Sequence, residues 1–278
     1  MGKISRTWSL MQMSWRLLTE DKKILIFPLM SLISCLATMA VFIVPMVMTN
    51  RWKPPTADAS TQQMVSYYSL VFLFYYCNYF VVIFFNSALV SYVVMRMNGD
   101  TPTVSDGLHA ALVRWPRIAG WALIAATVGF LLKLIEDRSE KIGQIVAAIL
   151  GSAWALVTFL VVPILVVEEQ TPFGALKEST KLLKQTWGEN IMMNISFSTI
   201  MFLLMIPAVI AIVLASMAHN AVILFICIAT VVLYFVLLAL VQSALEAIFQ
   251  TAIYFYARHS QVPPGFDEGD LQSAIAQR

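Results

Sequence analysis

The sequence predicts an all-α, polytopic membrane protein with six transmembrane helices and three amphipathic helices in the cytoplasmic-side interface. Hydrophobic residues make up 59% of the 278 residues, and only 12% are charged, which is about half the charged share of a typical soluble chain. The apolar residues also gather into long runs, and about twenty of them in a row allow a helix to cross a bilayer. Hydrocarbon is therefore the main solvent that this chain meets.

Six apolar runs reach or approach the length of a membrane-spanning helix. The third run is the shortest, and its Lys133 can extend along the helix to the interface. The sixth run exceeds the thickness of a bilayer, so its last turns should project from the membrane or lie tilted. We place the six spans at Ile24–Met48, Leu70–Met95, Ile118–Ile135, Ile145–Val167, Ile191–Met217 and Val222–Phe255.

The distribution of Lys and Arg over the connections predicts the orientation of the spans, because short cytoplasmic loops are enriched in these residues. Thirteen of the 18 lie at the two termini and in the connections between spans two and three and between spans four and five. Of the remaining five, four lie in the other connections and the fifth is Lys133, near the outer end of span three. Both termini should therefore face the cytoplasm.

Three segments, each preceding an odd-numbered span, share the pattern of a helix that lies flat in the membrane interface. Mostly apolar residues recur at i, i+4, i+7 and i+11, and the last of them is always Trp. Thr101-Pro102 and Thr171-Pro172 are typical helix starts, with a capping hydroxyl before a proline in the first helical position. The three sets are Ile4, Trp8, Met11 and Trp15; Val104, Leu108, Ala111 and Trp115; and Leu176, Thr180, Leu183 and Trp187.

These segments supply the side chains that we expect in contact with lipid headgroups. Tryptophan favours the interface between water and hydrocarbon, and a lysine stem can lie along apolar surface while its ammonium group reaches a phosphate. The predicted lipid-interface residues are Trp8, Trp15, Trp115, Lys177, Lys181, Lys184 and Trp187.

The recurring amphipathic helices also suggest a threefold internal repeat of interfacial helix, outward span, short loop and return span. The repeat units would be about 1–98, 99–168 and 169–260, which together form a single transmembrane domain. A mostly disordered cytoplasmic tail would follow at 261–278. Three unrelated helical hairpins with similar interface chemistry would produce the same pattern, and the sequence leaves both interpretations open.

Polar side chains at membrane depth are costly and indicate either a functional path or hydrogen bonds between helices. Span two holds Asn78 and Asn86 on roughly one face, and span six holds Gln242, Glu246 and Gln250 at i, i+4 and i+8. With polar residues at the start of span five, they would line a path open to the cytoplasm, with Glu246 as its ionisable centre. We favour the structural interpretation over this path.

Motifs for catalysis, cofactors or metal binding are absent from the sequence. It contains no phosphate-binding loop, nucleophile elbow or zinc-ligand spacing, and a net charge of +2 gives no indication of a nucleic-acid partner. Cys35, Cys77 and Cys227 all lie inside apolar runs, without the spacing of a metal site or a disulfide framework. We therefore predict no catalytic residues, no metal ligands and no cofactor.

Two stretches carry a resemblance to known proteins: "VVPILVVEEQTPFGALKESTKLLKQTWGEN" and "FQTAIYFYAR". They resemble a group of uncharacterised bacterial six-span membrane proteins, and the layout is similar to the membrane domain of some bacterial glycerophosphodiester phosphodiesterases. The resemblance implies a bacterial inner-membrane protein, and it carries no catalytic activity over because no phosphodiesterase domain is attached. The matching positions are Pro163, Val166, Glu168, Ala175, Lys177, Ser179 and Leu182.

The sequence favours a non-enzymatic protein of the bacterial inner membrane whose basic, Trp-ended helices engage anionic lipid. Such a protein would organise lipids or partner proteins, with a homo-oligomer as the expected assembly. One alternative is a small transporter or channel with a polar path through spans two, five and six. Another is a lipid-modifying membrane enzyme, which would need at least two convergent ionisable groups in a lateral pocket.

Overall fold

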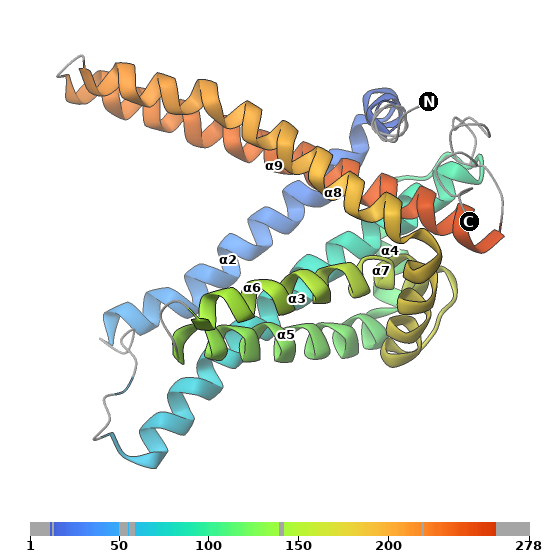
Figure 1. Ribbon diagram of the computed structural model, residues 1–278, viewed down its shortest axis with the longest axis horizontal. Helices are drawn as coiled ribbons and strands as arrows, with labels where there is room; N and C mark the ends of the chain where they lie inside the picture. Colours follow the sequence, from blue (N-terminus) through green and yellow to red (C-terminus); the bar gives the residue numbers. More distant parts are fainter. Residues whose placement is uncertain are drawn as a thin grey trace. The chain divides into compact units, whose positions relative to one another are not determined.

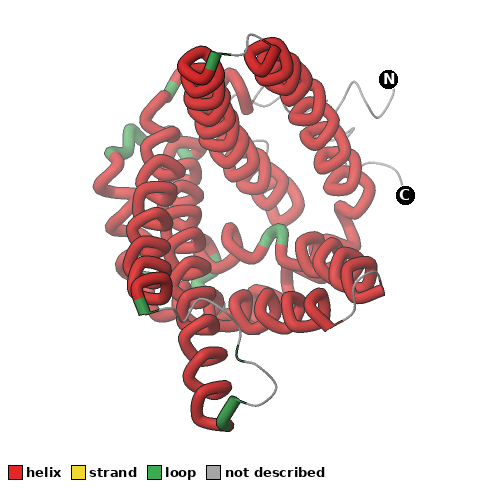
Figure 2. Tube along the Cα trace, turned by 90° about the vertical axis from the view of Figure 1, so that its left-hand side faces the viewer, coloured by secondary structure: helices red, strands yellow, loops and turns green. Residues whose placement is uncertain are grey.

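The computed structural model describes residues 12, 14–49, 55, 59–138, 142–217 and 220–259, apart from the side chains of 137–138, 184–202, 256 and 259. Figure 2 shows the described residues as helices joined by short loops, with no strand among them. Five of the described segments are long and apolar enough to cross a membrane, which confirms the predicted all-helical membrane fold. These segments are Lys22–Met48, Thr61–Met97, Trp115–Glu136, Ile142–Val167 and Ala221–Phe255.

The helices are labelled in chain order in Figure 1. They are η1 (Lys22–Leu25, a 3-10 helix), α2 (Ile26–Met48), α3 (Thr61–Met97), α4 (Val104–Val113), α5 (Trp115–Arg138), α6 (Ile142–Thr158), α7 (Val161–Val167), α8 (Pro172–Met217) and α9 (Ala221–His259). The expected fifth span, Ile191–Met217, lies within α8, and its part with described side chains is the apolar stretch Leu203–Met217. The total of six spans stays a prediction.

The chain divides into two compact units, which we name unit 1 and unit 2. Unit 1 consists of Met1–Leu25 and Lys184–Arg278, and unit 2 of Ile26–Leu183. The predicted repeat boundaries at 98 and 168 both fall inside unit 2, and the threefold repeat stays a prediction. The expected tail at 261–278 lies outside the described residues.

In unit 2, α3 is the central helix: α2, α4, α5 and α7 all pack against it, and α6 packs against α5 (Figure 1). Aromatic rings make many of these contacts, with centroid separations in the range where stacked, tilted and edge-on ring pairs attract each other. The pairs between helices are Phe27–Tyr92 at 5.4 Å, Phe42–Phe74 and Phe72–Phe130 at 5.7 Å, Trp121–Trp154 at 5.9 Å and Tyr75–Phe130 at 6.2 Å.

The predicted fourth span, Ile145–Val167, is two helices and not one. Helix α6 ends at Thr158, and α7 begins at Val161 after two residues in a turn. Pro163 explains the break, because a proline has no N–H to donate to the carbonyl four residues earlier and its ring collides with that carbonyl. Here that residue is Phe159, which lies in the turn.

The side chain of Ser179, in the first turns of α8, satisfies backbone groups that this break releases. Its hydroxyl donates to the carbonyl oxygen of Val157 at 2.6 Å and accepts the N–H of Leu160 at 3.3 Å. Ser179 itself is completely buried. One hydroxyl therefore stabilises the α6–α7 break and fixes the start of α8 against it.

Two predicted helix starts have different outcomes. At Thr171-Pro172 the prediction is confirmed: α8 begins at Pro172, and the hydroxyl of Thr171 accepts the N–H of Gly174 at 3.2 Å. At Thr101-Pro102 it is wrong, because Thr103 caps α4 in a capping box with Asp106.

Two segments also have other bounds than expected. Trp115 begins α5 and does not end α4, and the third amphipathic segment continues into the fifth span as one helix.

In unit 1, the part of α8 from Lys184 onwards and α9 form a helical hairpin (Figure 1). The hydroxyl of Tyr234 in α9 donates to the carbonyl oxygen of Leu204 in α8 at 3.1 Å, and η1 packs against α9. Asn220 caps the start of α9, since its side-chain oxygen accepts hydrogen bonds from the N–H groups of Val222 and Ile223. Large apolar side chains such as Phe225 (73% exposed) point away from the described residues of the protein, as expected where hydrocarbon is the solvent.

Replacing Ser179 with Ala should lower the free energy of unfolding by about 1–3 kcal/mol, because two buried backbone groups lose their partner. Thr180→Ala is the matched control: this half-buried hydroxyl donates only to Leu176 of its own helix, so its loss should be nearly neutral. Denaturant unfolding in detergent, followed by circular dichroism, measures both. Equal effects of the two substitutions would contradict the bridging role of Ser179.

Replacing Gly107 with Ala should also destabilise unit 2. An added Cβ would lie 2.8 Å from Cζ of Phe27 and 2.9 Å from the carbonyl oxygen of Ala88, and overpacking of this kind costs about 1–3 kcal/mol. Gly151→Ala is the control, because its Cβ would meet only Leu132 at 3.8 Å and alanine favours a helix. Thermal unfolding should show a lower midpoint for the first variant and an unchanged or higher one for the second.

Candidate functional site

The predicted lipid-interface residues are exposed wherever the structure describes their side chains. Trp15 is 52% exposed in unit 1 and Trp115 is 57% exposed in unit 2. Lys177 and Lys181 are also exposed, and Nζ of Lys181 lies 3.4 Å from Oε1 of Glu178. Trp8 and the side chains of Lys184 and Trp187 lie outside the described residues. The lipid contacts of the whole set stay a prediction.

The first turns of α8 bury a different face from the one that helical spacing suggests. Ala175, Ser179 and Leu182 are buried within the protein. Of the expected set, Leu183 is buried as well, and Leu176 and Thr180 are half-buried. Phe173, which precedes this set in the chain, is 72% exposed. Packing in unit 2 therefore uses one side of these turns and leaves Phe173, with the exposed lysines, on the surface.

An ion cluster joins the start of α5 to the turn between α7 and α8. Oε1 of Glu169 lies 3.3 Å from Nη2 of Arg114, and its Oε2 lies 3.3 Å from Nη1 of Arg117. The neighbouring Glu168 accepts a hydrogen bond from the side chain of Gln170 at 2.8 Å. Arg114 and Glu169 are 55 residues apart in the sequence, so the connections that contain them lie at the same end of unit 2. This agrees with the expectation that they share one side of the membrane.

Glu169 has a backbone conformation that favours glycine. Its φ is 53°, a positive value that non-glycine residues rarely adopt. Glu169 is the residue directly after Glu168, the C-cap of α7, and this position in a helix end is usually Gly. The left-handed conformation costs about 1–2 kcal/mol. Two partly exposed ion pairs, at up to about 1 kcal/mol each, offset this cost, so the Glu169 side chain accounts for the absence of glycine here.

The candidate polar path divides between the two units. Asn78 and Asn86 belong to α3 in unit 2, whereas Gln242, Glu246 and Gln250 belong to α9 in unit 1. The Asn78 amide donates to the carbonyl oxygen of Phe74 at 3.0 Å, and the Gln250 amide donates to Glu246 at 3.2 Å. Both bonds stay within one helix, so they are not the bonds between helices of the structural interpretation, and the role of these side chains stays a prediction.

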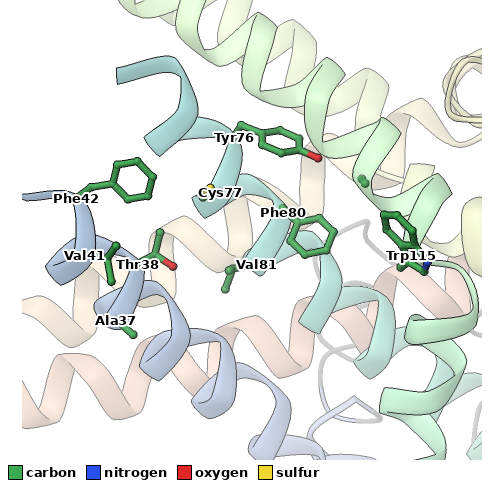
Figure 3. Close-up of a pocket in the computed structure, with 10 residues that line it drawn as sticks. Ala37, Thr38, Val41, Phe42, Tyr76, Cys77, Phe80, Val81 and Trp115 are labelled. Carbon is green, nitrogen blue, oxygen red and sulfur yellow. The ribbon is translucent and has the colours of Figure 1, made fainter. Parts of the chain in front are cut away.

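A groove lies between α2, α3 and the start of α5, entirely within unit 2 (Figure 3). Its volume of about 500 Å³ falls in the range of small-molecule sites, roughly 300–1,000 Å³. The walls are mostly apolar, with aromatic rings from all three helices. The lining residues are Ala37, Thr38, Val41, Phe42, Tyr76, Cys77, Phe80, Val81, Trp115 and Ala119.

The groove exists because small side chains lie between two ring contacts. Phe27 and Tyr92 hold α2 against α3 on one side of it, and Phe42 and Phe74 do so on the other. Ala37, Thr38, Cys77 and Ala119 contribute little volume between these contacts. Helical spacing alone does not reveal this hollow, because it depends on which small residues of different helices face each other.

The described residues contain no group of three or more His, Cys, Asp or Glu side chains that could hold a metal ion. Cys77 lies in the groove wall, and Cys35 and Cys227 are free thiols elsewhere in the described helices. The chemistry that the groove offers is therefore that of an apolar surface with a few hydroxyl, thiol and indole groups.

Residues 65–264 match the family of unknown function DUF6159. The chain belongs to this family. The DUF6159 match includes the α3 and α5 walls of the groove and the Glu169 ion cluster, while α2 precedes it. No curated protein and no solved structure matches the chain. These comparisons give no support for the resemblance to the membrane domain of glycerophosphodiester phosphodiesterases.

The capping box of α4 makes this short helix of the DUF6159 protein sensitive to acid. Oδ2 of Asp106 accepts hydrogen bonds from the N–H and the hydroxyl of Thr103, both at 2.8 Å. Both bonds lower the pKa of the Asp106 carboxyl, and the bond from the backbone N–H of Thr103 has the larger effect. The stabilisation is therefore complete above the ordinary Asp pKa and is lost as the pH falls through the lowered value.

We expect hydrogen exchange of the first α4 amides to become faster, relative to their intrinsic rates, as the pH falls through this range. Asp106→Asn should remove the acid-dependent part of the change, because its side chain does not titrate. Amides of α5 in the same sample provide the internal control. An unchanged acid dependence in the Asn variant would show that another group is responsible.

Proposed function

We propose that this DUF6159 protein is a non-enzymatic protein of the bacterial inner membrane that engages anionic phospholipid at the end of unit 2 where α5 and α8 begin. The observation that carries the proposal is the chemistry of that end. Exposed aromatic rings, Trp115 and Phe173, occur together with the exposed ammonium groups of Lys177 and Lys181. This combination is typical of protein surface in the headgroup region.

The position of these side chains relative to the apolar helices supports the proposal. Trp115 is the first residue of a candidate span, and Phe173 and Lys177 lie in the first turns of α8, which follows another candidate span, Ile142–Val167, after a short turn. The ion cluster of Glu169 holds both starts at one end of unit 2. Aromatic and basic groups therefore gather where a span meets the headgroups, which is where each lysine contributes about 1 kcal/mol of attraction to an anionic surface.

The orientation that follows places both termini and this end of unit 2 on the cytoplasmic side, because most Lys and Arg residues lie in the corresponding connections. The anionic lipid engaged would then belong to the inner leaflet. A role in organising lipids or partner proteins, with a homo-oligomer as the assembly, agrees with this placement. The transport alternative has less support, since the Asn78 and Gln250 amides are bonded within their own helices.

Replacing Lys177, Lys181 and Lys184 together with Glu should reduce the anionic phospholipid that co-purifies with the protein. Loss of three attractive charges, each worth about 1 kcal/mol, and gain of three repulsive ones predict a decrease of well over tenfold. Mass spectrometry of lipids extracted from the purified protein measures phosphatidylglycerol against phosphatidylethanolamine.

A single-charge pair provides the matched control. Lys177→Gln and Lys133→Gln remove the same charge, but Lys133 lies near the other end of α5 and pairs with Glu136 at 3.3 Å. Only the first should lower the ratio of phosphatidylglycerol to phosphatidylethanolamine. Unaltered lipid in the triple variant, or equal effects of the two single ones, would contradict the proposal.

A further inference from the structure

We propose that the groove between α2, α3 and α5 binds one acyl chain of an anionic membrane phospholipid. The inference rests on the proposed function for the headgroup, and it assigns to the groove a ligand and an orientation. The headgroup would lie at the Trp115 end, next to Arg114, and the chain would run along Phe80 and Tyr76 of α3 (Figure 3).

The surroundings of the groove determine what can fill it. Its walls come from three candidate membrane spans, so hydrocarbon surrounds its opening. Water is scarce in that region because it cannot keep its hydrogen bonds there. A lateral hollow with a volume of about 500 Å³ would lose dispersion contacts if it stayed empty. An acyl chain of a neighbouring lipid is the group that is available to fill the groove.

The polar groups of the wall favour a hydrocarbon chain over a headgroup inside the groove. The hydroxyl of Thr38 donates to the carbonyl oxygen of Ser34 at 2.9 Å, so it needs no partner from a ligand. The opposite wall presents the rings of Tyr76 and Phe80, whose centroids lie 6.5 Å apart. Such a wall gives a flexible chain close contact along its length and offers no charged group to a phosphate.

The end of the groove at Trp115 provides the charge that a phosphate needs. Trp115 is exposed and begins α5, and the guanidinium of the preceding Arg114 lies at the protein surface with 23% of its side chain exposed. Glu169 bridges the two arginines Arg114 and Arg117, and the neighbouring Glu168 accepts a hydrogen bond from Gln170. A phosphate beside Trp115 would lie near the guanidinium of Arg114, the residue that precedes it in the chain, and this group carries the complementary charge.

Photo-crosslinking of the full-length protein in nanodiscs tests the site. The probe is phosphatidylglycerol with a diazirine in one acyl chain, and crosslinked peptides are mapped by mass spectrometry. We expect the labelled positions to concentrate at 37–42 of α2 and 76–81 of α3. Ala37→Trp, which fills the groove, should lose this concentration and fall to the level of lipid-facing positions such as Val209 and Val213 in α8, which are exposed.

Ala40→Trp is the matched control, since Ala40 is exposed on the same helix and does not line the groove. Ala119→Trp fills the groove from the α5 wall and provides a second test if the Ala37 variant folds poorly, which its thermal midpoint would reveal. Labelling spread evenly over all lipid-facing helices, or unchanged by both filling variants, would mean annular lipid only and overturn the inference.

The same samples separate this inference from the proposed function. Loss of phosphatidylglycerol in the Lys177, Lys181 and Lys184 variant, with labelling unaffected by the groove-filling substitutions, would retain the surface role and reject the groove. Labelling concentrated in the groove, but equal for phosphatidylglycerol and a phosphatidylcholine probe with the same chain, would reject the anionic preference assigned to the Trp115 end.

Discussion

The packing of aromatic rings around α3 is the interaction on which the rest of unit 2 depends. In a bilayer the hydrophobic effect does not drive helices together, because lipid tails are as apolar as the side chains. Shape and ring geometry must do so. The Phe27–Tyr92 and Phe42–Phe74 contacts fix α2 on α3 at two points, and Phe130 of α5 packs on α3 through Phe72. The groove is a direct result of this two-point contact.

A second constraint positions the surface that we assign to lipid. Pro163 forces the break between α6 and α7, and the buried hydroxyl of Ser179 bridges the break from α8. Glu169, strained in the left-handed region, ties the turn before α8 to α5. With the start of α8 fixed at both places, Lys177 points outward from a rigid support and not from a loose loop.

Both sites that we propose use the boundary between hydrocarbon and headgroups. Trp115 belongs to both, since it is exposed at the start of α5 and also lines the end of the groove. A lipid that engages the basic surface could therefore insert one chain beside α3. In this arrangement the headgroup charge decides which lipid is engaged, and the groove decides where its chain lies. The family match includes α3, α5 and the first turns of α8, so other DUF6159 members are suitable for comparison of these positions.

The helical class, the long apolar segments that could cross a membrane and the start of α8 at Thr171-Pro172 were all predictable from the sequence. These features are local: each helix satisfies its own backbone in hydrocarbon, and a cap involves neighbours in the chain. The groove, the Ser179 bridge and the Glu169 ion cluster became apparent in the folded protein and were not predictable from the sequence. The Ser179 bridge and the Glu169 ion cluster depend on residues 19 to 55 positions apart that meet in space, and the groove depends on residues of three different helices. Composition and periodicity contain no information on such pairs, because they specify which face of a helix is apolar and not which helix it meets.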